Sequence, residues 1–124
     1  MNTYAPSNYG EPLKQSFEKE ALLSRCGNKN ELVKKLLNIV LDDIPKQIEK
    51  LDQAMKEGNT EELYKVAHKI KGTSLNLGFP ILKDIAEKLE KTGRVSPNIN
   101  LDIQMLLVQL KKEWELLLPL LLEF

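Results

Sequence analysis

The sequence predicts an all-α protein: an up-and-down antiparallel four-helix bundle with a short extra N-terminal helix. From residue 16 onward the apolar residues recur at intervals of three and four, which is typical of amphipathic helices and not of strands. Short links join the long segments of this kind, so consecutive helices should pack antiparallel. The length of 124 residues fits one domain. We assign residues 16–124 to the bundle and residues 1–15, which are polar and contain Pro6, Gly10 and Pro12, to a flexible linker or leader.

The charge balance and the cysteine count exclude several classes of function. Lys and Arg together number 18, as do Asp and Glu, so no net charge favours binding to nucleic acid or to an anionic membrane. Cys26 is the only cysteine, which rules out an intrachain disulfide and a cysteine-based metal site. The sequence shows no secretory signal, and its most apolar run, residues 116–122, is too short to span a bilayer. We therefore expect a cytoplasmic protein without membrane insertion.

A short accessory helix is predicted first, with Ser16 as its N-cap and its end near Gly27. Leu13, Phe17 and Ala21 would share one face of this helix.

The second predicted helix is long and runs from a cap at Asn30 to a stop at Gly58. Pro45 lies inside it and cannot donate to the carbonyl of Leu41, so we expect a kink there; two helices that meet at Pro45 are the alternative. The apolar stripe of this segment consists of Val33, Leu37, Val40, Ile44, Ile48, Leu51 and Met55.

Three more helices are predicted. The third starts at Thr60 and runs to about Leu77, and the fourth has Pro80 at its first position and ends at Gly93. The last follows the loop of residues 94–100. Their inner faces should carry Leu63, Val66, Ile70, Thr73 or Ser74 and Leu77 in the third helix, Ile81, Leu82, Ile85, Ala86 and Leu89 in the fourth, and Ile103, Leu106, Leu107, Leu110, Trp114, Leu117 and Leu121 in the last.

His68 is the only histidine, and its place on the third helix decides what it can do. A step of 100° per residue puts it about 140° or more from the inner-face residues, so its side chain should point outward. A solvated surface histidine is the simplest interpretation. Its neighbours on the helix favour a functional role instead. The residues within about 60° of His68 are Glu61, Tyr64, Lys65, Lys71, Gly72 and Leu75.

Gly72 and Lys71 indicate that this face handles an anion. Gly72 lies one turn beyond His68 inside a helix, where it costs about 1 kcal/mol relative to alanine, so a bare backbone should let a bulky group approach the ring. Close helix packing is the alternative reason for this glycine. Neutral imidazole can attack a phosphoryl group, and the Lys71 ammonium could offset the resulting negative charge, although a lysine alone can also be merely solvated.

The stretch from His68 to Gly78 resembles the signature of histidine-containing phosphotransfer (HPt) domains, His-x-x-Lys-Gly-Ser/Thr-Ser with a further Gly ten residues after the His. The resemblance covers roughly residues 16–115, including the proline-bearing helix and residues 89–94. It implies a four-helix bundle that accepts a phosphoryl group on histidine from a receiver-domain aspartate and passes it to another receiver in a phosphorelay.

Carried over to this chain, the resemblance makes His68 the phosphoryl acceptor, Lys71 its electrostatic neighbour and Gly72 the gap that admits the receiver. Thr73 stands where serine is most common and keeps the hydroxyl group; with Ser74 we assign it to helix packing, with a possible bond to the backbone. Some relatives have glutamine near the phosphoryl group where an ungapped count places Glu90 here, and a carboxylate would help less with an anion.

The expected partners are response-regulator receiver domains. Leu75 lies only about 20° from the direction of His68, so it should be exposed and could form the centre of a docking patch; an isolated exposed leucine is the alternative. Tyr64, Lys65 and Lys69 would form the rim. We expect a monomer that binds no metal and no cofactor, with Mg²⁺ held by the partner receiver domain.

The sequence is also compatible with two alternative functions. Autonomous kinase activity is not expected, because no glycine-rich phosphate loop and no nucleotide-binding α/β domain are present, so the chain would be a phosphoryl carrier. The phosphoacceptor domain of a chemotaxis-type histidine kinase shares the His-x-x-Lys-Gly pattern and is one alternative. A helical adaptor that is never phosphorylated is the other.

Overall fold

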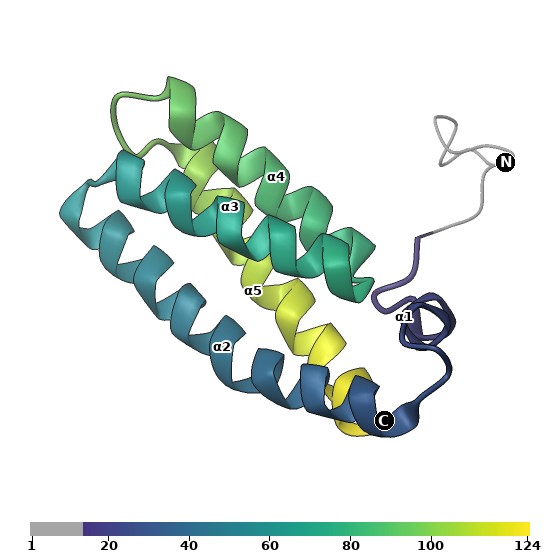
Figure 1. Cartoon of the computed structure of the whole chain (residues 1–124). Coiled ribbons are helices and arrows are strands. Elements are labelled where there is room, and N and C mark those ends of the chain that lie inside the picture. The colour runs from purple at the N-terminus through teal and green to yellow at the C-terminus, as the bar shows by residue number, and fades with distance from the viewer. Residues whose placement is uncertain (1–13) are drawn as a thin grey trace, which may run out of the picture.

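The computed structural model describes residues 14–124, which form five α-helices and, over that range, no strand (Figure 1). The helices are α1 (Lys19–Arg25), α2 (Asn30–Glu57), α3 (Thr60–Leu77), α4 (Pro80–Val95) and α5 (Leu101–Leu122). The predicted all-α bundle with a short extra N-terminal helix is therefore confirmed. Most of the expected linker, residues 1–13, lies outside the described residues. No helix of the described region is long and apolar enough to cross a membrane.

The four long helices pack around one core. The most extensive contact is between α3 and α4; α4 also packs on α5, while α2 touches both α3 and α5. As a result α3 and α5 occupy opposite corners of the bundle (Figure 1). The fully buried side chains of the core come from every long helix and include Val33, Ile44, Leu51, Leu63, Ile70, Leu82, Leu89, Ile103, Leu110 and Leu117.

The short helix α1 lies against the turn between α3 and α4, where the backbone N–H of Glu18 donates to the carbonyl of Gly78 at 2.8 Å (Figure 1). The prediction for this region was partly wrong. The helix starts after Glu18, so Ser16 is not its N-cap, and Phe17 precedes the helix and packs edge-on against Phe79. Consequently the buried side chain of α1 is that of Leu22, while Ala21 is exposed and Leu13 lies outside the described residues.

The long helix α2 runs through Pro45 without interruption, so the alternative of two helices is wrong. The side chain of Pro45 is exposed, where the loss of one backbone hydrogen bond is tolerated because water is near. The kink remains a prediction. Asn30 is the first helical residue and Lys29 takes the cap position, one residue earlier than predicted. Gly58 ends the helix with a left-handed backbone, as expected.

Gly93 does not end α4, which continues to Val95, so this prediction was wrong. Gly93 is buried where α4 crosses α3. A Cβ atom at this position would lie 3.1 Å from Cδ2 of Leu63 and 3.1 Å from Cβ of Tyr64. The glycine therefore allows the two helices to approach closely. This approach brings the side chains of α4 that follow Leu89 next to the outer face of α3.

Candidate functional site

His68 lies in the middle of α3 with its side chain 60% exposed, as the helical spacing predicted. Its Nδ1 atom is 2.9 Å from Oε2 of Glu90 on α4. An ionised carboxylate can only accept, so in the neutral ring Nδ1 carries the hydrogen and Nε2 keeps its lone pair. The contact thus leaves the other ring nitrogen, Nε2, with a free lone pair on an exposed ring.

Glu90 is the buried centre of the site, with only 5% of its surface exposed. Its Oε2 accepts from His68 and, at 3.0 Å, from Nη2 of Arg94, and its Oε1 lies 2.8 Å from Nζ of Lys71. Burial alone would raise the pKa of this carboxyl, but the contacts with Lys71, Arg94 and His68 outweigh it and lower the pKa to about 2. Glu90 is therefore an anion at neutral pH.

Arg94 is held from two sides. Besides its bond to Glu90, its guanidinium lies over the ring of Tyr64 at 4.6 Å from the centroid. Tyr64 was predicted as part of a docking rim; it is half-buried and contacts Arg94 instead of standing free. Sequence reasoning did not single out Arg94, although its spacing of four residues from Glu90 on one helix is a recognisable signal for an ion pair.

Lys71 forms an ion pair with Glu90 next to the imidazole. Its side chain is 26% exposed, and its ammonium forms the ion pair with the buried Glu90. The interpretation of Lys71 as a merely solvated lysine is therefore wrong. The same carboxylate anchors Lys71 and His68, so the ammonium is held on the side of the ring that faces α4.

Gly72 opens toward solvent. A Cβ atom built there would have no heavy atom within 4 Å other than those of its own helix backbone and chain neighbours, among the described residues. Close helix packing is thus not the reason for this glycine, in contrast to Gly93. The open space next to His68 fits the clearance that the sequence predicted.

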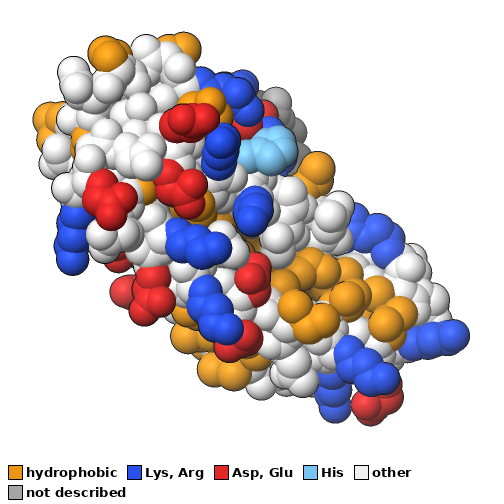
Figure 2. Space-filling view, turned by 60° about the vertical axis from the view of Figure 1, so that its left-hand side comes forward, with side chains coloured by type: hydrophobic (Ala, Val, Ile, Leu, Met, Phe, Trp, Pro, Cys, Tyr) orange, Lys and Arg blue, Asp and Glu red, His pale blue; other side chains and the backbone are white. Residues whose placement is uncertain are grey.

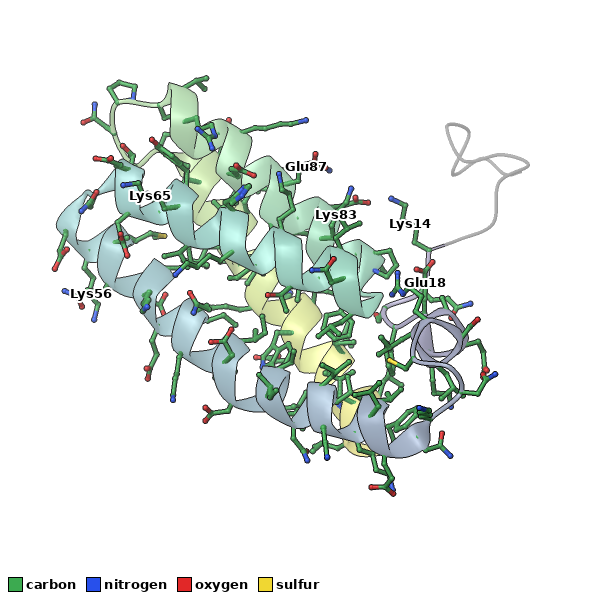
Figure 3. The ribbon with its side chains drawn as sticks, viewed as in Figure 1. Lys14, Glu18, Lys56, Lys65, Lys83 and Glu87 are labelled. Atoms are coloured by element: carbon green, nitrogen blue, oxygen red, sulfur yellow. The ribbon has the colours of Figure 1, made fainter. Side chains whose placement is uncertain are left out.

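The remaining predicted partner-binding residues lie on the same exposed face. Leu75 is 59% exposed, and Lys65 and Lys69 are exposed as well. Lys65 projects from the first half of α3 (Figure 3), where it pairs with Glu61 at 3.1 Å. Figure 2 shows the single histidine among Lys and Arg side chains on this face.

A row of charges flanks the site along α4. Lys83 pairs with Glu87 and Asp84, each at 3.3 Å, and Lys91 lies 3.7 Å from Glu87 (Figure 3). These opposite charges largely compensate one another, so the positive charges near His68 are the lysines of α3 and Arg94 of α4. Residues 14–124 hold no cluster of three or more His, Cys, Asp or Glu side chains that could bind a metal ion.

Thr73 and Ser74 differ in their surroundings. Ser74 is fully buried, as expected for a packing residue, but its Oγ has no hydrogen-bond partner among the described residues, so the predicted bond to the backbone is absent. Thr73 is only partly buried. Among the described residues, the hydrogen bond of the His68 side chain is with Glu90 and not with either hydroxyl.

Together these features define a class: a helical bundle that presents one exposed histidine on its surface over a buried carboxylate. The comparisons with known proteins give the family. The family model "Hpt domain" matches residues 35–118, more than half of the chain, and the chain therefore belongs to the Hpt domain family. Histidine phosphotransfer in two-component signalling is the function of this family, whose members interact with receiver domains in phosphorelays.

A solved structure supports the fold. The chain is similar to the HPt domain from the Hpt sensor hybrid histidine kinase from Shewanella, with a TM-score of 0.74 and 18% sequence identity. The similarity covers 87% of this chain and 92% of the Shewanella domain. At this identity the likeness concerns the fold alone. No curated protein sequence matches the chain.

Proposed function

We propose that His68 is the phosphoryl carrier, accepting the group from the aspartyl phosphate of one receiver domain and passing it to the aspartate of another. The observation that supports this most strongly is the contact between Nδ1 of His68 and the ionised, buried Glu90. It fixes the hydrogen on Nδ1 and leaves the Nε2 lone pair free on an exposed ring.

In the forward step the Nε2 lone pair attacks the phosphorus atom while the bond from phosphorus to the aspartyl oxygen breaks. The leaving aspartate keeps the electron pair, and the histidine becomes a phosphoramidate. Glu90 balances the positive charge that develops on the ring, because its carboxylate already accepts the Nδ1 hydrogen. Transfer to a second receiver is the same step in reverse.

In this proposal Lys71 compensates the charge of the phosphoryl group, and Gly72 provides space for the receiver. Lys71 is tethered to Glu90 on the α4 side of the ring, from where its ammonium can compensate the charge of a phosphoryl group on Nε2. Gly72 leaves room for the receiver's phosphorylated aspartate. In this proposal Leu75, Lys65 and Lys69 meet the receiver surface, while Tyr64 stacks on Arg94 and so helps to hold Glu90 in place.

The proposal assigns the divalent cation to the receiver. Mg²⁺ would stay with the partner's phosphoaspartate, and this chain would supply only protein groups. We further propose a cytoplasmic setting, since Cys26 as a single cysteine suits a reducing compartment.

Incubation of the chain with radiolabelled phospho-receivers tests the proposal. We expect a label on the chain that is lost in acid and kept in alkali, and that is absent in His68→Gln. Addition of a second, unlabelled receiver should then remove the label from the chain. A matched control is Lys35→Gln, an exposed lysine of α2 outside the site; it should retain the label. Failure of wild type to accept label from several receivers would favour the helical adaptor.

A further inference from the structure

The outer face of α5 carries a stripe of apolar side chains that the described part of the chain leaves uncovered. Its members are Leu101, Met105, Val108 and Leu122, with Leu116 at its border, and each of them is between 52% and 66% exposed. The side of α5 that packs in the bundle, with Leu110 and Leu117, lies about 180° away around the helix. Several exposed apolar side chains on one helix face indicate an interaction surface.

The spacing of this stripe is that of a coiled-coil seam. Steps of four and three residues alternate along α5, at positions 101, 105, 108, 112, 115, 119 and 122. All of these positions are apolar except the fourth and fifth, which hold Lys112 and Glu115. Since another helix with the same spacing can fill such a seam, the pattern fits a helical occupant.

The charges of Lys112 and Glu115 indicate which helix can pair with this face. We propose that α5 pairs with α5 of a second copy of this chain in antiparallel orientation. A two-fold axis midway between Lys112 and Glu115 makes Lys112 of each copy face Glu115 of the other. The same register sets Val108 against Pro119 and Met105 against Leu122 on both sides of the axis. A parallel pair would instead place like charges opposite each other, which is unfavourable.

This pairing leaves the phosphotransfer face free. Because α3 and α5 lie at opposite corners of the bundle, the His68 sites of the two copies would point away from the interface. One helix per copy makes a small interface, so the dimer should be weak and form in the micromolar range. The proposal does not depend on the function of His68, and it replaces the expectation of a monomer.

Sedimentation velocity of the full chain over a range of about 10 to 1,000 µM tests the pairing. We expect wild type to shift from monomer to dimer with increasing concentration. Val108→Glu, which puts a charge in the seam, should remain monomeric. Ile39→Glu is the matched control, because Ile39 is also a largely exposed β-branched residue but lies on α2; it should dimerise as wild type does. Circular dichroism checks that the variants are folded.

Charge reversal tests the register. Lys112→Glu and Glu115→Lys should each weaken self-association by about tenfold or more, because like charges then face each other at both central positions. An equimolar mixture of the two variants should form a heterodimer, and the double variant should dimerise like wild type. A wild type that is monomeric at every concentration would overturn the proposal. So would a result in which neither the equimolar mixture nor the double variant dimerises. Co-sedimentation of monomeric wild type with phosphatidylcholine vesicles would overturn it too, by assigning the stripe to a lipid surface.

Discussion

His68 and Arg94 contact the same oxygen of Glu90, at 2.9 Å and 3.0 Å respectively. One carboxylate therefore links the imidazole ring to a guanidinium that is itself stacked on Tyr64. Because Glu90 is buried and its rotamer is restrained on both sides, the orientation of the imidazole is fixed before any partner arrives. This makes Glu90 and Arg94 positioning residues for the proposed transfer.

Replacement of Glu90 by leucine should weaken the preference of the neutral His68 ring for the tautomer with hydrogen on Nδ1. Without an acceptor at Nδ1, the neutral ring in water has no strong reason to keep its hydrogen there. We expect the population with hydrogen on Nδ1 to fall, and the rate of phosphotransfer to drop by about tenfold or more. The nitrogen chemical shifts of the ring, recorded at alkaline pH, measure the tautomer directly.

The matched variant at the second contact is Arg94→Gln. It retains Glu90 as the acceptor but removes the charge and the stacking on Tyr64, so the tautomer should stay while the rate falls by a smaller factor. A tautomer that is unchanged in Glu90→Leu would contradict the positioning role, whatever the transfer rate.

The acid stability of the protein should depend on Glu90. Its pKa is about 2 in the folded chain and near 4.5 when unfolded, so the unfolded state binds the proton first as the pH falls. The carboxylate therefore contributes its full stabilisation above about pH 4.5 and loses it progressively toward pH 2. A shift of this size corresponds to at most about 3 kcal/mol in the free energy of unfolding.

Urea denaturation at several pH values checks this dependence. The difference in unfolding free energy between wild type and Glu90→Gln should be largest near neutral pH and shrink between about pH 4.5 and pH 2. Glu49→Gln is the control, because Glu49 is exposed on α2; its difference from wild type should be small at all pH values. A constant gap for Glu90→Gln would show that its carboxylate is not the group that titrates.

Ser74→Ala should leave the protein as stable as wild type or stabilise it by about 1 kcal/mol. The hydroxyl is fully buried and has no hydrogen-bond partner among the described residues, so its desolvation is not compensated. Thermal unfolding of the two proteins measures the difference. A loss of more than about 1 kcal/mol would mean that Ser74 makes a hydrogen bond that matters.

The sequence predicted the helices and the reactive face well because both depend on local spacing. The outward direction of His68, the open surroundings of Gly72 and the exposed Leu75 all follow from 100° steps along one helix. The contact between His68 and Glu90 joins residues on two helices, and helical periodicity does not give their relative height. For the same reason the sequence wrongly predicts that Gly93 ends the fourth helix, because the burial of Gly93 depends on the crossing of α4 with α3.

The two glycines of the site should respond oppositely to alanine. In Gly93→Ala the new Cβ would lie 3.1 Å from Cβ of Tyr64, which cannot move without shifting α3 against α4, so we expect destabilisation by about 1 to 3 kcal/mol. In Gly72→Ala the new Cβ meets open space, and the gain in helix propensity should stabilise the fold by up to about 1 kcal/mol. Urea denaturation of both variants measures these changes. Equal effects at the two positions would contradict the assignment of Gly93 to helix packing and of Gly72 to clearance. A Gly72→Ala variant that is more stable but transfers phosphate more slowly would show that the bare backbone serves the partner and not the fold.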